Sequence, residues 1–306
     1  MLDCDPGIDD SLAILLALAS NELEIKAITT VFGNAELKQT TKNALNVLEL
    51  SKAKNIPPVG EGSGQPLKGT CVDLARGVHG NDGLGNRNLP QPKLKVYTDD
   101  GIGLIISKLN SGQVDTIIAT GPLTNLARAI SRNPEVLRYI KTLYIMGGAV
   151  FVEGNVTPHA EFNFYSDPDA ADYVLNSNIP IVLISLDVTH KVNVTERHIE
   201  PLKKYKNRLA EFVVGVVEYS IEYHRAYRGA VGAHLHDPLA VAIAVEPKLG
   251  SYEWLSLGVD CTNRRGMVQV MSGTKNVRFV KEFDVEGFLK LFLDRIGGAI
   301  EAIQNL

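Results

Sequence analysis

Four aspartates lie within the segment Leu2–Asp10, close enough together to act as one chemical unit. Asp3 and Asp5 are two positions apart, so on a β-strand their side chains would point to the same side. A Pro-Gly pair then predicts a turn, and Asp9 and Asp10 stand where a helix would begin. One of these last two residues could cap that helix, but a cap accounts for only one carboxylate of the four.

Such a cluster needs positive charge nearby. At an effective dielectric constant near 20, two like charges about 5 Å apart repel each other by roughly 3 kcal/mol. Either a bound cation or protons retained by raised pKa values must offset this repulsion. Carboxylate oxygens suit hard cations such as Ca²⁺ and Mg²⁺. The cluster therefore predicts a divalent metal site, with a purely structural cap and turn as the alternative.

Two known acidic motifs differ from this segment. An EF-hand loop needs glycine at its sixth position and glutamate at its twelfth, but counting from Asp3 gives Ile8 and Ile14. A phosphatase of the haloacid-dehalogenase type carries Asp-x-Asp-x-Thr/Val at a strand end, whereas Gly7 stands at the Thr/Val position here. That phosphatase class is the runner-up, and a non-catalytic protein that binds nucleosides or Ca²⁺ is a third possibility.

The elements that position these residues follow an alternating pattern. Four nearly continuous apolar runs predict parallel strands covered on both faces: Ile25–Val31, Val114–Ala119, Thr142–Met146 and Ile179–Leu186. Between and around them lie helical patterns: Ser11–Ala19, Thr40–Leu50, Gly101–Leu109, Asn125–Ile130 and Asp169–Leu175. This alternation predicts an α/β fold with a doubly wound, mostly parallel (mixed), Rossmann-like sheet flanked by helices. We expect a single domain over residues 1–306.

The C-terminal part of the chain has a different pattern. Met267–Met271 and Val277–Lys281 flank a short polar stretch that contains Gly273, which predicts an antiparallel hairpin followed by a helix from about Val285 to Ile303. Two further segments, Gly60–Pro92 and Tyr223–Leu235, lack a clean periodic pattern. We expect them to be binding loops at the rim of the sheet.

The composition of the chain limits the classes of partner that it is expected to bind. The chain has 306 residues and a formal net charge of −4, without the basic patch of a nucleic-acid-binding protein. Its three cysteines (Cys4, Cys71 and Cys261) are widely spaced and predict neither a disulfide framework nor a zinc site. The apolar run Leu12–Ala19 is too short to span a bilayer, and no basic stretch precedes it. We expect a cytoplasmic protein that binds neither nucleic acid nor membrane.

Several motifs follow the predicted strands at the edge where ligands of open α/β sheets bind. These are Asn34, the segment Thr120–Asn125, Met146 with two glycines, His190, and, further on, His236 and Asp237. Asn155, Glu161 and Asn163 lie in the loop between two strands and suit contacts to sugar hydroxyls. Considered alone, His190 is interpreted as structural, Asn125 as a helix cap, and His79 equally well as a binding residue or as one without a role.

Taken together, the motifs resemble those of the inosine-uridine-type nucleoside hydrolases, which are metal-dependent ribonucleoside N-glycosidases. The Asp-x-Asp-Pro-Gly-x-Asp-Asp opening is similar to the signature of that family, and five further matches follow in the family's order: Asn34, Thr120–Asn125, Met146–Gly148, Asn155 with Glu161–Asn163, and His236–Pro238. The resemblance spans essentially the whole chain. It implies hydrolysis of ribonucleosides of the inosine, uridine and cytidine type to ribose and free base, in purine and pyrimidine salvage.

The resemblance also implies a role for each matched residue. Ca²⁺ would be held by Asp5, Asp10, Asp237 and the backbone carbonyl of Thr120, with Asp3 supporting these ligands from behind. The ribose hydroxyls would bind to Asp9, Asn155, Glu161 and Asn163, while Asn34, Met146 and His79 would line the sugar site. A homotetramer or homodimer is expected by the same resemblance.

The reaction requires a water nucleophile and a stabilised leaving group. The C1′–N bond of a nucleoside breaks through an oxocarbenium-like transition state, as in other glycosides. Asp5 is expected to act as general base toward a Ca²⁺-bound water. His236 is expected to act as general acid, with a working pKa near neutrality. Tyr223 and Tyr227 are four residues apart, so they would share one helix face, either as ordinary packing or to stack on the base.

Two further features of the sequence, its N-terminus and its single tryptophan, each lead to an expectation. Only Met1 and Leu2 precede Asp3, whereas members of the family carry several apolar residues there, so we expect a longer natural N-terminus. Trp254, the single tryptophan, lies outside the expected binding loops, which favours a broad or pyrimidine-leaning enzyme.

Overall fold

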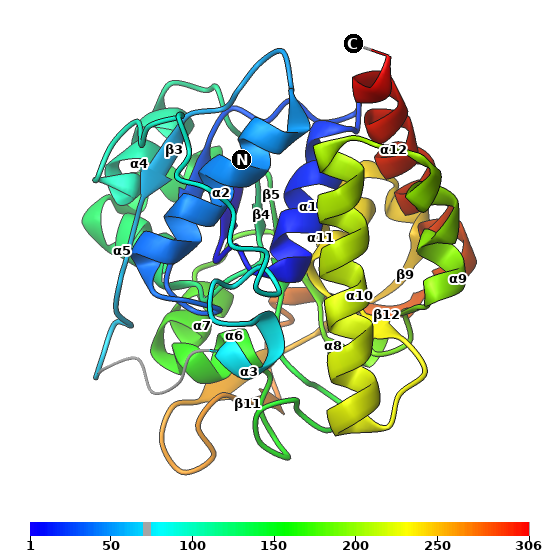
Figure 1. Ribbon diagram of the computed structural model, residues 1–306. Coiled ribbons are helices and arrows are strands. Elements are labelled where there is room, and N and C mark those ends of the chain that lie inside the picture. The colour runs from blue at the N-terminus through cyan, green and yellow to red at the C-terminus, as the bar shows by residue number, and fades with distance from the viewer. Residues whose placement is uncertain (70–74, 306) are drawn as a thin grey trace.

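A sheet of eight strands organises the computed structural model, which describes residues 1–69 and 75–305 (Figure 1). In order across the sheet, the strands are β3 (Val59–Glu61), β2 (Ile28–Thr30), β1 (Leu2–Cys4), β4 (Thr116–Ala119), β5 (Thr142–Met146), β6 (Ile181–Ile184), β12 (Val277–Phe283) and β9 (Gly250–Leu255). Neighbouring strands are parallel except β9, which runs antiparallel to β12. The expected mostly parallel, mixed sheet is confirmed.

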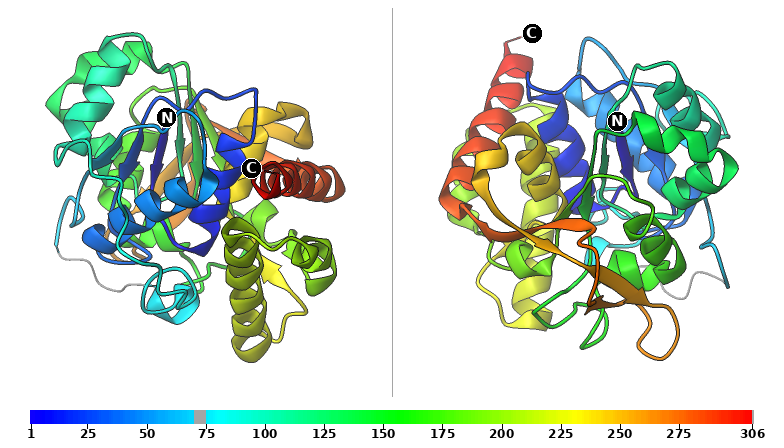
Figure 2. Two further views of the ribbon diagram at one scale, coloured as in Figure 1. Left: turned by 45° about the horizontal axis from the view of Figure 1, so that its top comes forward. Right: turned by 180° about the vertical axis from the view of Figure 1, so that it is seen from behind.

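Helices cover both faces of the sheet, which explains why its strands are apolar on both sides. In β4, Ile118 packs into one core, and its neighbours Ile117 and Ala119 pack into the other. The first core contains α1 (Ile8–Leu18), α2 (Leu37–Ser51), α10 (Arg208–Arg228), α11 (Asp237–Val245) and α12 (Val285–Gln304); the second contains α4 (Gly101–Asn110), α5 (Thr124–Arg132) and α7 (Pro168–Leu175). The view from behind in Figure 2 shows the second layer in front of the sheet.

The remaining elements are short. Two small antiparallel ribbons pair β7 (Asn193–Val194) with β8 (Ala233–His234), and β10 (Leu257–Asp260) with β11 (Met267–Val270). The short helices are α3 (Arg76–His79), α6 (Phe162–Ser166), α8 (Leu186–Thr189) and α9 (Glu196–Ile199), and 3₁₀ turns span Pro134–Tyr139, Glu200–Lys204 and Pro247–Leu249. In Figure 1, α3 and α6 lie below the sheet, beyond the carboxyl ends of the parallel strands.

Strand order determines where a ligand site can form. The chain builds β1, β2 and β3 outward in one direction and then crosses to β4, which lies on the other side of β1. In a doubly wound sheet of this order, the crevice for ligands opens beyond the carboxyl ends of the two strands at such a crossing point. The aspartate motif follows β1 and the Thr120–Asn125 motif follows β4, so both motifs reach this crevice.

The expected C-terminal hairpin between Met267–Met271 and Val277–Lys281 does not form. Instead, β11 pairs with β10, and β12 enters the large sheet parallel to β6, where Phe279 lies opposite Leu183. Val277 and Phe279 are buried in the second core. Pairing within the large sheet removes these apolar side chains from water, which a hairpin at the surface would not do.

Four other expectations from the sequence can be compared with the structure. The last helix is confirmed as α12. The segment Tyr223–Leu235 is not a loop throughout, because α10 extends to Arg228 and β8 follows. Cys4 and Cys261 form no disulfide, and Cys71 lies outside the described residues. Within the described ranges, no helix has the length and apolar character needed to cross a bilayer.

Candidate active site

Four buried carboxylates lie in the crevice beyond β1 and β4, and we call them the aspartate floor: Asp5, Asp9, Asp10 and Asp237. Asp5 follows β1, Asp9 and Asp10 belong to the first turn of α1, and Asp237 begins α11. Oxygens of Asp9, Asp10 and Asp237 all lie within 4.8 Å of one another. The fold therefore joins the N-terminal cluster to a carboxylate from a distant part of the sequence.

Hydrogen bonds fix the carboxylate of Asp10. It accepts from the side chain of Asn34 at 2.8 Å, from the hydroxyl of Thr120 at 2.8 Å and from the backbone N–H of Gly7 at 3.1 Å. The backbone N–H of Asn34 also donates to Asp5 Oδ2 at 2.7 Å. A Cβ atom on Gly7 would lie 2.7 Å from Asn34 Nδ2, so only glycine permits this arrangement at the turn.

The floor is strongly acidic, and its surroundings make ionisation difficult. Burial, followed by the charge of Asp9, raises the pKa of Asp10 to about 6. Burial and the charge of Asp10 raise the pKa values of Asp5 and Asp237 well above their usual range. None of the described residues that line the adjoining cavity is Lys or Arg. In their ionised form the carboxylates would therefore repel one another, and no cationic side chain among these lining residues would neutralise them.

These side chains fit a hard divalent cation. Oδ1 of Asp5 and Oδ1 of Asp9 are buried and accept no hydrogen bond. Buried polar atoms in folded proteins almost always have partners, so unpaired carboxylate oxygens indicate a missing positive partner. Oxygen donors of this kind are the usual ligands of Ca²⁺ and Mg²⁺.

Asp3 lies behind the floor and belongs to a supporting network. Its Oδ1 accepts from the hydroxyl of Thr29 at 2.6 Å and from Asn125 Nδ2 at 2.8 Å. Asn125 Oδ1 in turn accepts from the backbone N–H of Ser63 at 2.8 Å. Burial raises the pKa of Asp3 to about 6, although these two hydrogen bonds oppose the shift. Asn125 is therefore a link between strands rather than the helix cap that it resembles in isolation.

A polar wall stands beside the floor, formed by the start of α6 and the loop before it. Asn163 donates from Nδ2 to the backbone carbonyls of Thr120 at 2.7 Å and Met146 at 3.2 Å. Glu161 caps α6 and accepts from the backbone N–H groups of Asn163 and Gly148, both at 2.9 Å. Burial raises the pKa of Glu161 to about 7. The wall thus offers amide and carboxyl groups held in fixed positions.

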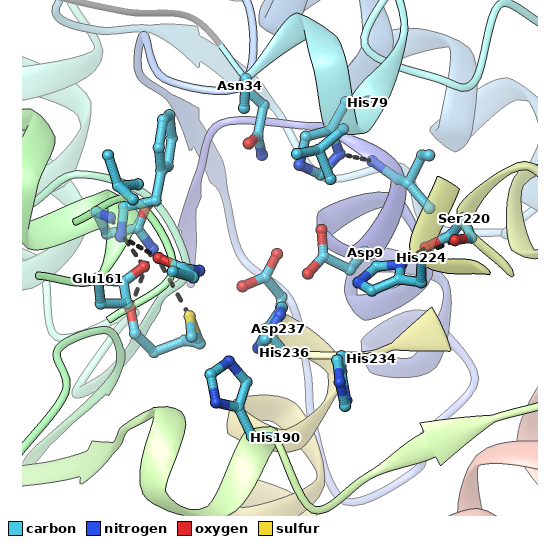
Figure 3. A pocket seen from close by; sticks show the side chains of 18 of the residues that line it. Asp9, Asn34, His79, Glu161, His190, Ser220, His224, His234, His236 and Asp237 are labelled. Carbon is cyan, nitrogen blue, oxygen red and sulfur yellow. Dashed lines mark hydrogen bonds between the residues drawn. The ribbon is translucent and has the colours of Figure 1, made fainter. Parts of the chain in front are cut away.

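The floor and this wall border a cavity of about 380 Å³, shown in Figure 3. Its volume falls in the range of small-molecule sites. The cavity is lined by Ile8, Asp9, Asn34, Ala75, Val78, His79, Thr120, Met146, Gly154, Asn155, Val156, Glu161, Phe162, Asn163, His190, Ser220, Tyr223, His224, Ala230, His234, His236 and Asp237. Nearly all of the side chains singled out in the sequence therefore meet at one place; Asp3, Asp5 and Asp10 lie behind the lining.

Four imidazole rings form the opposite side of the cavity, and we call them the histidine wall: His190, His224, His234 and His236. Neighbouring rings pack with centroids 5.4 to 6.2 Å apart. With His79 included, five of the chain's seven histidines line the cavity. Figure 3 shows this wall across the aspartates from Glu161.

The pKa of His236 differs from the value expected from the sequence. Its Nδ1 lies 2.8 Å from the hydroxyl of Thr189, and burial lowers its pKa to about 3. The ring is therefore neutral near pH 7 in the ligand-free protein, whereas the sequence led us to expect a pKa near neutrality. The difference arises because burial disfavours the charged imidazolium, and sequence position alone does not reveal burial.

The aromatic pair on α10 is only partly at the site. Tyr223 lines the cavity, and its ring centroid lies 5.0 Å from that of Tyr227. Tyr227 itself is 75% exposed and is not among the lining residues. The two residues share a helix face as expected, but Tyr227 lies one turn further along, beyond the cavity.

Sequence reasoning does not identify most of the histidine wall. It interprets His190 as structural and singles out neither His234 nor Ser220. One signal was present: His234 and His236 are two positions apart, so in an extended segment they point to the same side. Nothing local connects these two residues with His190 or His224, because the contact depends on how α8, α10 and β8 pack.

Comparisons with known proteins agree with this geometry. Residues 1–290 match the family described as inosine-uridine preferring nucleoside hydrolase. The chain is 38% identical over 305 residues to a pyrimidine-specific ribonucleoside hydrolase, RihA, from Salmonella gallinarum, and the match covers 97% of each chain. Among solved structures, a purine-preferring ribonucleoside hydrolase from Gardnerella vaginalis superposes with a TM-score of 0.94 at 30% identity, covering 98% of each chain. A plant nucleoside hydrolase gives 0.90 at 33% identity, over 96% of this chain and 97% of that one.

Proposed function

The chain belongs to the inosine-uridine preferring nucleoside hydrolase family, and we propose that its aspartate floor and polar wall hold the ribose of a ribonucleoside while water displaces the base. The overall reaction, hydrolysis of the N-glycosidic bond, follows from membership of the family. The observation that carries the proposed arrangement is the set of unpaired, buried carboxylate oxygens beside a cavity lined with sugar-compatible groups.

We propose Ca²⁺ as the cation of the floor, held by Asp5, Asp10, Asp237 and the backbone carbonyl of Thr120. The unpaired Oδ1 of Asp5 and the raised pKa of Asp237 support a site that needs a cation. The Thr120 carbonyl already accepts from Asn163, but a carbonyl oxygen has a second lone pair. When bound, such a cation supplies the positive charge that acidifies a water molecule and orients sugar hydroxyls.

Ribose binding is assigned to the side chains on either side of the floor. Asp9 lies in the cavity on one side, and Asn155, Glu161 and Asn163 lie on the other. Carboxylate and amide groups can form paired hydrogen bonds with vicinal hydroxyls. Asn34, Met146 and His79 complete the lining around the sugar. Asp3 holds its position behind these residues through Thr29 and Asn125.

Asp5 is the proposed general base. Its Oδ2 is occupied by the N–H of Asn34, whereas Oδ1 is free of hydrogen bonds and can receive a proton. The water oxygen forms a bond to C1′ as the C1′–N bond breaks; one water proton passes to Asp5 and then to solvent, and the other stays on the new C1′ hydroxyl. The departing base takes a proton that the acid draws from solvent. The two oxygens of Asp5 thus differ in role: Oδ2 holds the carboxylate in place, whereas Oδ1 has one lone pair for the cation and another for the proton of the water.

His236 is the proposed acid for the departing base. Although its imidazole is neutral in the ligand-free protein, negative charge that develops on the base would favour the protonated ring. Thr189 holds one ring nitrogen, which leaves the other directed away from that contact. Tyr223 lines the same part of the cavity and can stack on the base, whereas Tyr227 lies outside it.

Further properties are proposed from the same premises. Similarity to RihA supports pyrimidine ribonucleosides as substrates. A role in base and ribose salvage within the cytoplasm is proposed from the resemblance to the family alone. A homodimer or homotetramer is proposed from the resemblance to the family, and exposed apolar side chains such as Phe151, Trp254 and Met271 are available for contacts between subunits. Size-exclusion chromatography with light scattering would test the assembly; a monomer at micromolar concentration would contradict it.

Release of free ribose is the direct test of the proposed function. Purified protein is incubated with uridine, cytidine or inosine, and ribose is followed by a reducing-sugar assay, before and after chelation by EDTA and after restoration with Ca²⁺. We expect ribose without added phosphate, loss of activity on chelation, and recovery with Ca²⁺. Activity that survives complete removal of metal would refute the proposed metal site, and the absence of ribose from all nucleosides would refute the proposed reaction.

A further inference from the structure

His234 occupies a defined place in the histidine wall. It lies on β8, opposite Asn193 of β7, so the small ribbon fixes its backbone. Its ring lies between those of His190 and His224, with both centroid distances at 5.4 Å. The residue lines the cavity, and the proposed reaction assigns it no role.

The hydrogen bond of His234 determines its tautomer. Nδ1 lies 3.0 Å from the backbone carbonyl oxygen of Val192. A carbonyl oxygen can only accept, so Nδ1 must carry the hydrogen in this contact. In the neutral ring, Nε2 therefore carries a lone pair and acts as an acceptor.

His79 presents the opposite polarity on another side of the cavity. Its Nδ1 accepts from the backbone N–H of Ile8 at 3.0 Å, so Nδ1 is unprotonated and Nε2 carries the hydrogen. Burial lowers the pKa of His79, which keeps this ring neutral near pH 7. The cavity thus holds one imidazole fixed as an acceptor and one fixed as a donor (Figure 3).

The position of His234 relative to the ribose groups indicates which part of the substrate it meets. In Figure 3, Asp9 and Asp237 lie at the centre, Glu161 lies on one side, and His234 lies on the other. With the ribose held between the central aspartates and Glu161, the space beside His234 is left for the base. None of the described lining residues is Lys or Arg, so recognition of the base there depends on neutral hydrogen-bonding groups.

We propose that His234 is a specificity-determining residue, whose Nε2 accepts a hydrogen bond from an N–H group of the base. This inference rests on the proposed function, because it takes the ribose to lie at the aspartate floor. The recognised group is an N–H donor, either the ring imide of uracil and hypoxanthine or the exocyclic amine of cytosine.

The test removes the donor from the substrate and the acceptor from the protein. Uridine is compared with 3-methyluridine, and cytidine with N4,N4-dimethylcytidine, at pH 8; each methylation leaves the ribose and the scissile bond unchanged. If the wild-type protein recognises an N–H group of the base, methylation of that group should lower kcat/KM by about tenfold. This is the effect expected for the loss of one hydrogen bond in a closed site. The pair that responds identifies the imide or the amine.

Two substitutions separate recognition of the base from structural support. In His234→Asn, the side-chain amide nitrogen can replace Nδ1 in the contact with Val192, but the side chain is too short to reach the base. In His234→Gln, the longer amide can place its oxygen near the position of Nε2. We call the ratio of kcat/KM for the unmethylated nucleoside to that for the methylated one the methylation penalty. In His234→Asn this penalty should disappear, because only the unmethylated substrate loses a hydrogen bond and therefore activity. In His234→Gln the penalty should return in part.

If His234→Asn lowered kcat/KM equally for a nucleoside and its methylated form, the role of His234 would be merely structural and the proposal would be overturned. A methylation penalty that persists in His234→Asn would overturn it as well. Hydrolysis of the methylated nucleosides serves as the control that the reaction itself is intact. If the wild-type protein released no ribose from any nucleoside, the proposed function would fail; equilibrium dialysis of uridine and 3-methyluridine against wild-type and His234→Asn protein would then decide the role of His234 separately.

Discussion

The aspartate floor and the histidine wall face each other across one cavity, and they are built in different ways. Three of the four floor residues come from a single stretch at the junction of β1 and α1, and several hydrogen bonds fix Asp10. The rings of the wall come from α10, from β8, from the residue after α8 and from the residue before α11. Two of them, His234 and His236, are anchored by contacts to Val192 and Thr189. In the floor, Asp5, Asp10 and Asp237 have raised pKa values, so a bound cation would favour their ionised form, whereas the wall consists of imidazoles.

This difference indicates that the floor and the wall have separate roles in the site. A floor held at many points suits chemistry that depends on accurate placement of the sugar and of water. Because the histidine wall is assembled from separate elements, substitutions in it can change the enzyme's preference for a base without disturbing the aspartate floor. Substitutions in the floor should therefore affect reaction of all substrates, whereas substitutions in the wall should affect some substrates more than others.

Asp5→Asn is expected to have the largest effect. The substitution keeps an oxygen for the N–H of Asn34 but removes the proton acceptor, so kcat should fall by about 10³-fold or more for every nucleoside. Binding of uridine, measured by equilibrium dialysis at high Ca²⁺, should stay within about tenfold of wild type, since the side-chain contacts to ribose remain. Asp99→Asn, at an exposed position, is the matched control. A kcat close to that of wild type would remove Asp5 from the role of base.

His236→Ala should have a smaller effect that depends on the substrate. Loss of the proposed acid should lower turnover of inosine by about 10²-fold, the usual contribution of general acid catalysis. A riboside with an activated leaving group, such as p-nitrophenyl riboside, should be almost unaffected, because its leaving group does not need a proton. The ratio of the two rates is the measurement. Equal losses on both substrates would assign His236 to the binding of ribose or to structure.

Asn125→Ala tests the support behind the floor. The substitution removes the hydrogen bond to Asp3 and the one to the N–H of Ser63. Loss of such an outer partner typically costs about tenfold or more in metal affinity. We expect a weaker apparent affinity for Ca²⁺, with kcat at saturating Ca²⁺ close to that of wild type. Unchanged affinity in a variant that folds normally would show that this network does not position the floor.

The smallest predicted effect is a pH dependence of stability in the metal-free protein. The pKa values of Asp3 and Asp10 are raised to about 6, and that of Glu161 is raised to about 7. Because these folded-state values exceed the unfolded ones, the groups stabilise the fold at low pH, and this contribution is lost as pH rises through 6 to 7. We expect the Tm to fall by several degrees between about pH 5 and about pH 8.

Saturating Ca²⁺ provides the control for this pH dependence. Binding of the cation requires deprotonated carboxylates, so it should raise the Tm most at the higher pH and flatten the profile. If the Tm of the metal-free protein rose over the same interval, the carboxylates would be ionised without difficulty, and the argument for a missing cation would lose its electrostatic support.

The same contrast explains what the sequence revealed. The floor could be predicted because its aspartates are close in sequence and because strand order brings Asp237 and Thr120 to the same crevice. The parallel strands could be predicted because burial on both faces leaves continuous apolar runs, as in Thr142–Met146. These features depend on local sequence and on a simple rule of topology.

Long-range packing explains the errors. The polar turn around Gly273 indicated a hairpin, but Val277 and Phe279 gain more burial from pairing within the large sheet than β12 would gain by pairing with β11. The role of His234 depends on its contact with Val192, 42 positions away. The depressed pKa of His236 depends on burial. None of these properties is encoded in neighbouring residues.

Calorimetric titration of metal-free protein with Ca²⁺ is the most direct test of the division between floor and wall. Wild-type protein, Asp5→Asn and His234→Asn are compared under identical conditions. We predict one Ca²⁺ per chain with similar affinity in wild type and His234→Asn, and much weaker binding in Asp5→Asn. Unaltered Ca²⁺ binding in Asp5→Asn, or its loss in His234→Asn, would contradict the assignment of the cation to the aspartate floor.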